Sequence, residues 1–134
     1  MTTTARPHAL IVDDNPDNRL VIRIALESRN FVVEDIGDPI HAQDVLNTRT
    51  FDLLILDLQM PGRTGREILL TLRPNPLHDH MKVIILTAHA YLNTDEIENK
   101  ADFTLQKPFN PVELAALCDR IQASSAPNIT AHTG

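Results

Sequence analysis

The stretch FDLLILDLQM at residues 51–60 is apolar almost throughout until it reaches Asp57, and it decides the fold. A strand with one face in water alternates apolar and polar side chains, but residues 51–56 do not. Such a run predicts a strand that is covered on both faces, which is typical of a parallel sheet. The other candidate strands lie at residues 9–12, 31–33, 83–86 and 103–105.

Amphipathic segments separate these strands and predict helices between them. Asn15 and Asn110 can each cap a helix, and each is followed by a proline, which suits the first helical position. The expected helices lie at about residues 16–29, 40–46, 66–72, 94–100 and 111–121. The interpretation is an α/β fold with a doubly wound, five-stranded parallel sheet flanked by five helices.

Two of these helices allow a prediction of their buried faces. The buried stripe of the first helix is expected to consist of Leu20, Val21, Ile24 and Ala25. The last helix is expected to be mostly core through Val112, Leu114, Ala115, Leu117, Cys118 and Ile121. Cys118 is the single cysteine, so an internal disulfide is impossible, and it is interpreted as a small buried residue rather than a nucleophile.

The chain has 134 residues, which suits one domain, expected at residues 8–121. Residues 1–7 are expected to be a flexible N-terminus, and residues 122–134 a disordered tail. No apolar run approaches the roughly 20 residues of a membrane span, and no signal peptide is visible, so a cytoplasmic protein is expected. The formal net charge of −6 argues against direct binding of nucleic acid.

Polar side chains follow four of the five predicted strands. Asp13 and Asp14 come after the first strand, Asp57 after the third, Thr87 after the fourth and Lys107 after the fifth. Because the carboxyl ends of parallel strands meet at one edge of the sheet, these groups should lie together. Crowded carboxylates repel unless a cation lies among them, and Mg²⁺ prefers such hard oxygen ligands.

This set of groups favours phosphoryl transfer, which needs positioning and charge neutralisation more than covalent machinery. A carboxylate can be the nucleophile, and Asp57 on a central strand is the candidate. Lys107 adds a cation suited to a phosphate oxygen, and Thr87 adds a hydroxyl donor. The alternative for Asp13 and Asp14, taken by themselves, is a solvated acidic loop.

Four segments resemble the response-regulator receiver family: IVDDN at 11–15, LDLQMPG at 56–62, LTA at 86–88 and KPF at 107–109. The resemblance covers about residues 8–121. It implies a flavodoxin-like fold with strand order 2-1-3-4-5. It also implies that Asp57 accepts phosphate from a histidine kinase or a histidine phosphotransfer protein.

The resemblance further implies roles for individual residues. Asp14 would ligate Mg²⁺ directly and Asp13 through water, while Asp57 and the backbone carbonyl of Gln59 would complete the protein ligands. Thr87 and Lys107 would contact the phosphoryl oxygens. The peptide bond between Lys107 and Pro108 is expected to be cis, as in similar proteins.

The chain departs from the family pattern three residues before Lys107, where Thr104 replaces the usual aromatic residue. Phe103 is one position earlier and so should face the other side of the strand. The usual aromatic coupling is therefore in doubt. Gln59 and His89 flank the expected phosphate, and we hypothesise that they limit or orient the attacking water.

Three functions follow as alternatives. The first is a phospho-signalling receiver without its own output domain, which acts on a downstream protein and is no enzyme beyond its own phosphorylation and dephosphorylation. The second is a Mg²⁺-dependent phosphohydrolase, disfavoured because Gln59 stands where a second Asp would act as general acid. The third is a non-phosphorylated scaffold.

Two surface features complete the expectations. The segment His78-Asp79-His80 is interpreted as surface residues rather than a metal site. Apolar surface at the fourth and fifth helices is a candidate site for a partner or a homodimer.

Overall fold

The computed structural model describes residues 6–60, 65–88 and 100–125. Its centre is a five-stranded sheet in the order β2-β1-β3-β4-β5, in which every neighbouring pair is parallel. The α/β class, the parallel sheet and the strand order are therefore confirmed. The strands are β1 (His8–Val12), β2 (Val32–Ile36), β3 (Leu53–Asp57), β4 (Lys82–Thr87) and β5 (Phe103–Gln106).

The described residues contain four α-helices and one short 3-10 helix, η1, rather than the five helices expected. The predicted helix at 94–100 falls outside the described residues except for Lys100. None of the described helices has the length and apolar character that a membrane span requires. The helices are α1 (Pro16–Glu27), α2 (Pro39–Thr48), α3 (Gly65–Leu72), η1 (Pro76–His78) and α5 (Pro111–Ser125).

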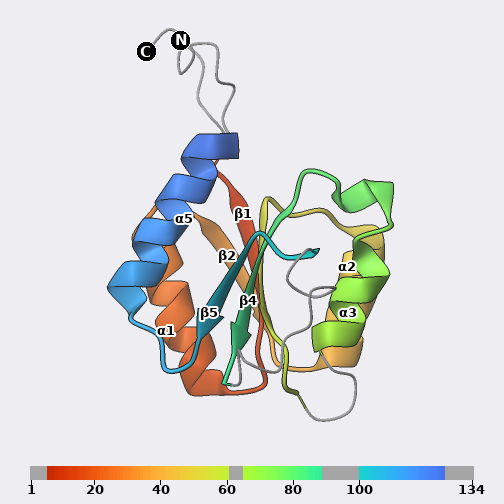
Figure 1. Cartoon of the computed structure of the whole chain (residues 1–134), viewed down its shortest axis with the longest axis horizontal. Helices are drawn as coiled ribbons and strands as arrows, with labels where there is room; N and C mark the ends of the chain where they lie inside the picture. Colours follow the sequence, from red (N-terminus) through yellow and green to blue (C-terminus); the bar gives the residue numbers. More distant parts are fainter. Residues whose placement is uncertain (1–5, 61–64, 89–99, 126–134) are drawn as a thin grey trace, which may run out of the picture.

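Helices cover both faces of the sheet, with α1 and α5 on one side and α2 and α3 on the other (Figure 1). Alternate residues of each strand enter the two cores. On β3, Ile55 packs with α1 and α5, whereas Leu54 and Leu56 pack with α2 and α3. Burial of both strand faces explains the nearly continuous apolar runs in the sequence.

The predicted buried stripe of α1 is wrong in three of its four members. Leu20 is 57% exposed, Ile24 is 59% exposed and Val21 is also exposed, whereas Ala25 is buried as expected. The core face instead consists of Ile22, Ala25 and Leu26. Apolar residues occur on two faces of this helix, so a period of 3.6 fits either stripe.

Helix α5 differs from its prediction at both ends. Val112 is 71% exposed, because it lies in the first turn and outside the row of residues that reaches the sheet. The other apolar residues predicted for this core are buried, including Cys118. The helix continues to Ser125, so the expected tail begins with helix; Pro127 is the first helix-breaking residue after Ile121.

The prediction for residues 78–80 needs correction at one position. His78 is buried rather than at the surface, because its ring Nε2 lies 2.7 Å from the carbonyl oxygen of Leu46 on α2. His80 is exposed, as expected. Arg6, which lies within the expected N-terminal segment, donates from its guanidinium to the carbonyl oxygens of Asn30 and Phe31.

Candidate functional site

Four neighbouring strands deliver the candidate residues to one edge of the sheet. Asp57 and Thr87 are the last residues of β3 and β4, while Asp13 and Lys107 directly follow β1 and β5. The Nζ atom of Lys107 lies 3.3 Å from Oδ2 of Asp13 and 3.3 Å from Oδ2 of Asp57. The structure thus brings together residues that are far apart in the sequence, as predicted. The peptide bond between Lys107 and Pro108 is cis, also as expected.

The carboxylates of Asp13, Asp14 and Asp57 form a cluster suited to a cation. One oxygen from each lies within 4.8 Å of the other two. Among the described residues, no other group of three acidic, histidine or cysteine side chains meets this criterion. Asp13 and Asp57 are buried and Asp14 is exposed, so a cation could enter from the Asp14 side. The donor set of three carboxylates fits Mg²⁺, which takes hard oxygen ligands and retains water.

The electrostatics of Asp57 reflect this crowding. The pKa of its carboxyl is raised from 3.8 to about 6, first because burial disfavours the charged form and second because Asp13 is close by. A hydrogen bond of 3.1 Å from the backbone N–H of Gln59 and the ammonium of Lys107 act in the opposite direction. The buried carboxylate is therefore one that a divalent cation would stabilise strongly.

Asp13 is held in place by the start of α1. Its carboxylate accepts hydrogen bonds from the backbone N–H of Asn15 at 2.9 Å and from the Asn18 side chain at 3.4 Å. The side chain of Asn15 caps the helix by accepting from Asp17 and Asn18, as the sequence predicted for an Asn before a proline. The helix cap and the acidic cluster are consequently one local structure.

Arg19 is a residue of this site that the sequence interpretation missed. Its Nη1 donates to the carbonyl oxygen of Asp13 at 2.8 Å, and its Nε pairs with Asp35 at 3.0 Å. Arg23, one helical turn later, pairs with the other oxygen of Asp35 at 2.6 Å. The sequence did show two arginines four residues apart, which place both side chains on one face of the helix. Their shared partner, Asp35 on β2, could not be identified without knowing the strand order.

The side chain of Gln59 extends from the end of β3 to the end of β4, where it contacts Thr87 and Ala88. Its Oε1 accepts hydrogen bonds from the hydroxyl of Thr87 at 3.2 Å and from the backbone N–H of Ala88 at 3.4 Å. Thr87 is completely buried, whereas Gln59 and Ala88 are exposed. The side chain therefore covers a hydroxyl that the sequence interpretation assigned to a phosphoryl oxygen.

The remaining candidate residues lie apart from this cluster. Thr104 is exposed on β5 and pairs in register with Ile85, while Phe103, 41% exposed, pairs with Ile84. Ile84 and Ile85 belong to opposite cores, so Thr104 and Phe103 do face opposite sides. Phe103 therefore does not take the place of the missing aromatic residue. His89 lies outside the described residues.

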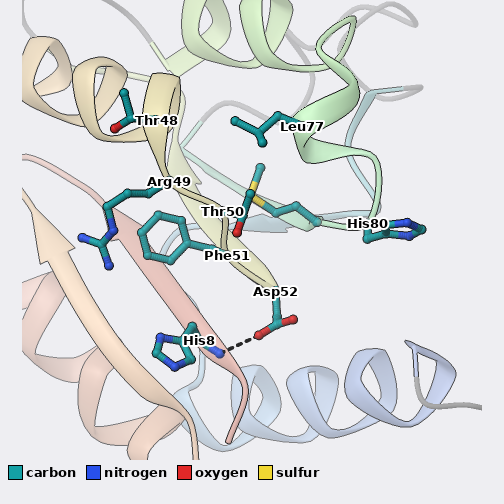
Figure 2. A pocket seen from close by; sticks show the side chains of 9 residues that line it. His8, Thr48, Arg49, Thr50, Phe51, Asp52, Leu77 and His80 are labelled. Atoms are coloured by element: carbon teal, nitrogen blue, oxygen red, sulfur yellow. Dashed lines mark hydrogen bonds between the residues drawn. The ribbon is translucent and has the colours of Figure 1, made fainter. Parts of the chain in front are cut away.

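A cavity of about 690 Å³ lies at the opposite edge of the sheet, where β1 and β3 begin (Figure 2). Its charged groups already have partners: Asp52 accepts a 2.8 Å hydrogen bond from the backbone N–H of His8, and Arg49 pairs with Glu34. Arg49 also lies over the ring of Phe51, 5.0 Å from its centroid. We therefore assign the candidate site to the acidic edge.

Comparison with known proteins agrees with the fold. Residues 9–119 match the family of the response regulator receiver domain. The sensor histidine kinase GacS of Pseudomonas protegens is 34% identical over an alignment of 114 residues that covers 81% of this chain and 12% of GacS. An uncharacterized 14.6 kDa protein of Leptolyngbya boryana is 32% identical over 119 residues, covering 87% of this chain and 91% of that protein.

Solved structures give the same result. The response regulator protein TrrA of Thermotoga maritima, determined in complex with Mg²⁺ and BeF, has a TM-score of 0.76 and 28% identity, with 86% of this chain and 98% of that chain covered. The chain belongs to the response regulator receiver domain family. It spans about an eighth of the length of GacS, so a receiver can be one part of a longer protein.

Proposed function

We propose that this protein is a phospho-accepting receiver of two-component signalling, in which Asp57 takes a phosphoryl group in a Mg²⁺-dependent reaction. The observation that carries the proposal is the pair of contacts from Lys107 to Asp13 and Asp57 within the acidic cluster. A cation and three carboxylates at one sheet edge suit the binding of a metal and a phosphoryl group side by side.

The chemistry would follow from the positions of these side chains. A carboxylate oxygen of Asp57 attacks the phosphorus of a phosphohistidine, the P–N bond breaks, and its electron pair remains on the imidazole, which takes up a proton. Asp14, Asp13, Asp57 and the Gln59 carbonyl would hold Mg²⁺, which supplies charge neutralisation when bound. Lys107 and Thr87 would contact the phosphoryl oxygens, and Lys107 would offset their developing charge.

The partners would be a histidine kinase or a histidine phosphotransfer protein and a downstream protein. Family membership and the kinase GacS among the relatives support this assignment. Three of the exposed apolar residues, Val21 and Ile24 on α1 and Val112 at the start of α5, line a groove of about 330 Å³. The fourth helix, part of the expected dimer surface, lies outside the described residues.

We further propose that output occurs through protein contact in the cytoplasm, and that the protein undergoes phosphorylation without acting on other substrates. Gln59 supports this last point, because its carboxamide cannot exchange protons as the carboxyl group of a phosphohydrolase would. Gln59 and His89 are proposed to set the lifetime of the aspartyl phosphate. If Gln59→Ala and His89→Ala leave that lifetime unchanged, this assignment is wrong.

Incubation with acetyl phosphate and Mg²⁺, followed by intact mass spectrometry, tests the proposal. We expect a single added phosphoryl group in the wild type, none in Asp57→Asn, and none in the wild type with excess chelator. Asp52→Asn is the matched control at the other end of β3 and should still be phosphorylated. Sustained turnover would instead indicate a phosphohydrolase, and absence of modification would indicate a scaffold.

A further inference from the structure

The orientation of the Gln59 carboxamide follows from its two contacts. The backbone N–H of Ala88 can only donate a hydrogen bond, so the group that faces it must be the carboxamide oxygen. The same oxygen accepts from the Thr87 hydroxyl, which is buried at the end of β4. One oxygen atom thus occupies a position between a hydroxyl donor and an N–H donor.

These two donors are close to the reacting carboxylate. Asp57 pairs in register with Leu86, the residue before Thr87, and the N–H of Leu58 donates to the carbonyl oxygen of Leu86 at 3.0 Å. Lys107 contacts Asp57 from β5, on the other side of β4. A phosphoryl group on Asp57 would therefore meet Lys107, Thr87 and Ala88 as its cation and its neutral donors.

We propose that the Gln59 carboxamide oxygen is a placeholder for a phosphoryl oxygen: it satisfies Thr87 and Ala88 in the unphosphorylated protein and must leave when Asp57 is phosphorylated. This inference rests on the proposed function. It means that the Gln59 side chain competes with the phosphoryl group for the same two hydrogen-bond donors. Two acceptor oxygens cannot occupy the same position between these donors, so binding of the phosphoryl group includes the cost of displacing Gln59.

The local structure allows this displacement. The backbone of Gln59 is anchored by its N–H, which donates to Oδ1 of Asp57 at 3.1 Å. Its side chain is exposed and can rotate into water, where the carboxamide regains hydrogen bonds. Displacement consequently moves only the side chain, and it transfers the carboxamide oxygen from Thr87 and Ala88 to water.

The test is the affinity for beryllofluoride, a phosphoryl mimic, in the presence of saturating Mg²⁺, measured by calorimetry on the full chain. Gln59→Leu removes the competing oxygen and keeps a side chain of similar bulk, so we expect binding about three- to tenfold tighter than in the wild type. Gln59→Asn keeps the carboxamide but is one methylene shorter, and it should also bind more tightly. Gln59→Glu should bind more weakly, because a carboxylate accepts more strongly from both donors and repels the anion.

Gln106→Leu is the matched control, because it makes the same change at an exposed residue that ends the neighbouring strand β5. Its affinity should equal that of the wild type. Unchanged or weaker binding by Gln59→Leu would overturn the inference, since it would mean that Gln59 preorganises Thr87 for the ligand. Failure of the wild type to bind beryllofluoride or accept phosphate would overturn the proposed function as well.

Discussion

Arg19 donates a hydrogen bond of 2.8 Å from Nη1 to the backbone carbonyl oxygen of Asp13, and this contact fixes the loop that carries the acidic cluster. The Arg19→Gln variant should lose both this bond and the ion pair with Asp35. Because groups behind metal ligands set the orientation of those ligands, we expect Mg²⁺ affinity to fall by about tenfold. Calorimetric titration with Mg²⁺ measures this change.

Arg23→Gln is the control for this variant. Arg23 also pairs with Asp35, and its other partner is Glu27 on the same helix. It should reduce stability by about 1 kcal/mol or less, as expected for a partly exposed ion pair, and leave Mg²⁺ affinity within about twofold. Equal losses of Mg²⁺ affinity in the two variants would show that the affinity depends on the ion pairs with Asp35 rather than on the contact with the Asp13 carbonyl.

Gly65 begins α3 against the backbone of the residue that carries the phosphate in our proposal. A Cβ atom at Gly65 would lie 1.9 Å from the carbonyl oxygen of Asp57 and 2.9 Å from Cα of Leu58. Backbone atoms cannot rotate away as a side chain can, so Gly65→Ala should displace α3 or β3. We expect a loss of about 3 kcal/mol or more in the free energy of unfolding, measured by urea denaturation.

Gly37→Ala provides the comparison for Gly65. There the new Cβ would meet Nη1 of Arg19 at 2.5 Å, which is the end of a flexible side chain. The arginine can shift, so the loss of stability should be smaller than for Gly65→Ala, but the Asp13 contact should weaken. Gly37→Ala is therefore expected to lower Mg²⁺ affinity in the same direction as Arg19→Gln. A loss of stability as large as that of Gly65→Ala would contradict this explanation.

The raised pKa of Asp57 predicts how stability depends on pH without Mg²⁺. The folded-state pKa of about 6 exceeds the ordinary 3.8, so the native state binds more protons than the unfolded state between these values. Ionisation of Asp57 therefore lowers the free energy of unfolding as pH rises from about 4 through 6, by up to about 3 kcal/mol. Asp57→Asn should be about 2 to 3 kcal/mol more stable than the wild type at pH 8, and the difference should vanish near pH 4.

Urea denaturation at these two pH values, with chelator present, checks the prediction. Asp52→Asn is the control, because Asp52 is exposed at the other end of β3 and should not change the slope between pH 4 and 6 in this way. A wild-type stability that rises steadily relative to Asp57→Asn over this range would contradict the raised pKa.

Cys118 should not react with thiol reagents in the folded protein. It is fully buried on the face of α5 that packs against the core, and burial raises the pKa of its thiol to about 12. Since the thiolate is the reactive form, a thiol reagent should label the protein only when α5 leaves the sheet. We expect labelling at pH 8 to be slower than for unfolded protein by a factor that increases with stability. Rapid labelling under native conditions would contradict the packing of α5.

The sequence predicted the architecture well because a nearly continuous apolar run indicates, by itself, a strand that is buried on both faces of a parallel sheet. Leu53–Asp57 could be assigned to a central parallel strand without knowing its neighbours, and the structure confirms that placement. Helix α1 shows the limit. Leu20 and Ile24 satisfy the helical period as well as Ile22 and Leu26 do, and the choice between them is made by tertiary contacts such as the Arg19 ion pair.

The site shows the same division. Asp13, Asp57 and Lys107 could be grouped because each comes where a parallel strand ends, and this rule holds for any such sheet. The contact between Gln59 and Ala88 could not be predicted, because it depends on the rotamer of one side chain. His78 was interpreted as a surface residue for a similar reason, since its partner is a carbonyl oxygen of α2 that no pattern indicates.

The parallel arrangement also shapes the field that an approaching phosphoanion experiences. Helices α1 and α5 begin at Pro16 and Pro111, just after Asp13 and Lys107, and α3 begins at Gly65 beside the backbone of Asp57. Each helix start carries about half a positive charge, and the three are directed towards the same edge. These helix starts offset part of the negative charge of Asp13, Asp14 and Asp57, and in a chain with a formal net charge of −6 they ease the approach of an anion once a cation is bound there, which makes the encounter rate sensitive to ionic strength.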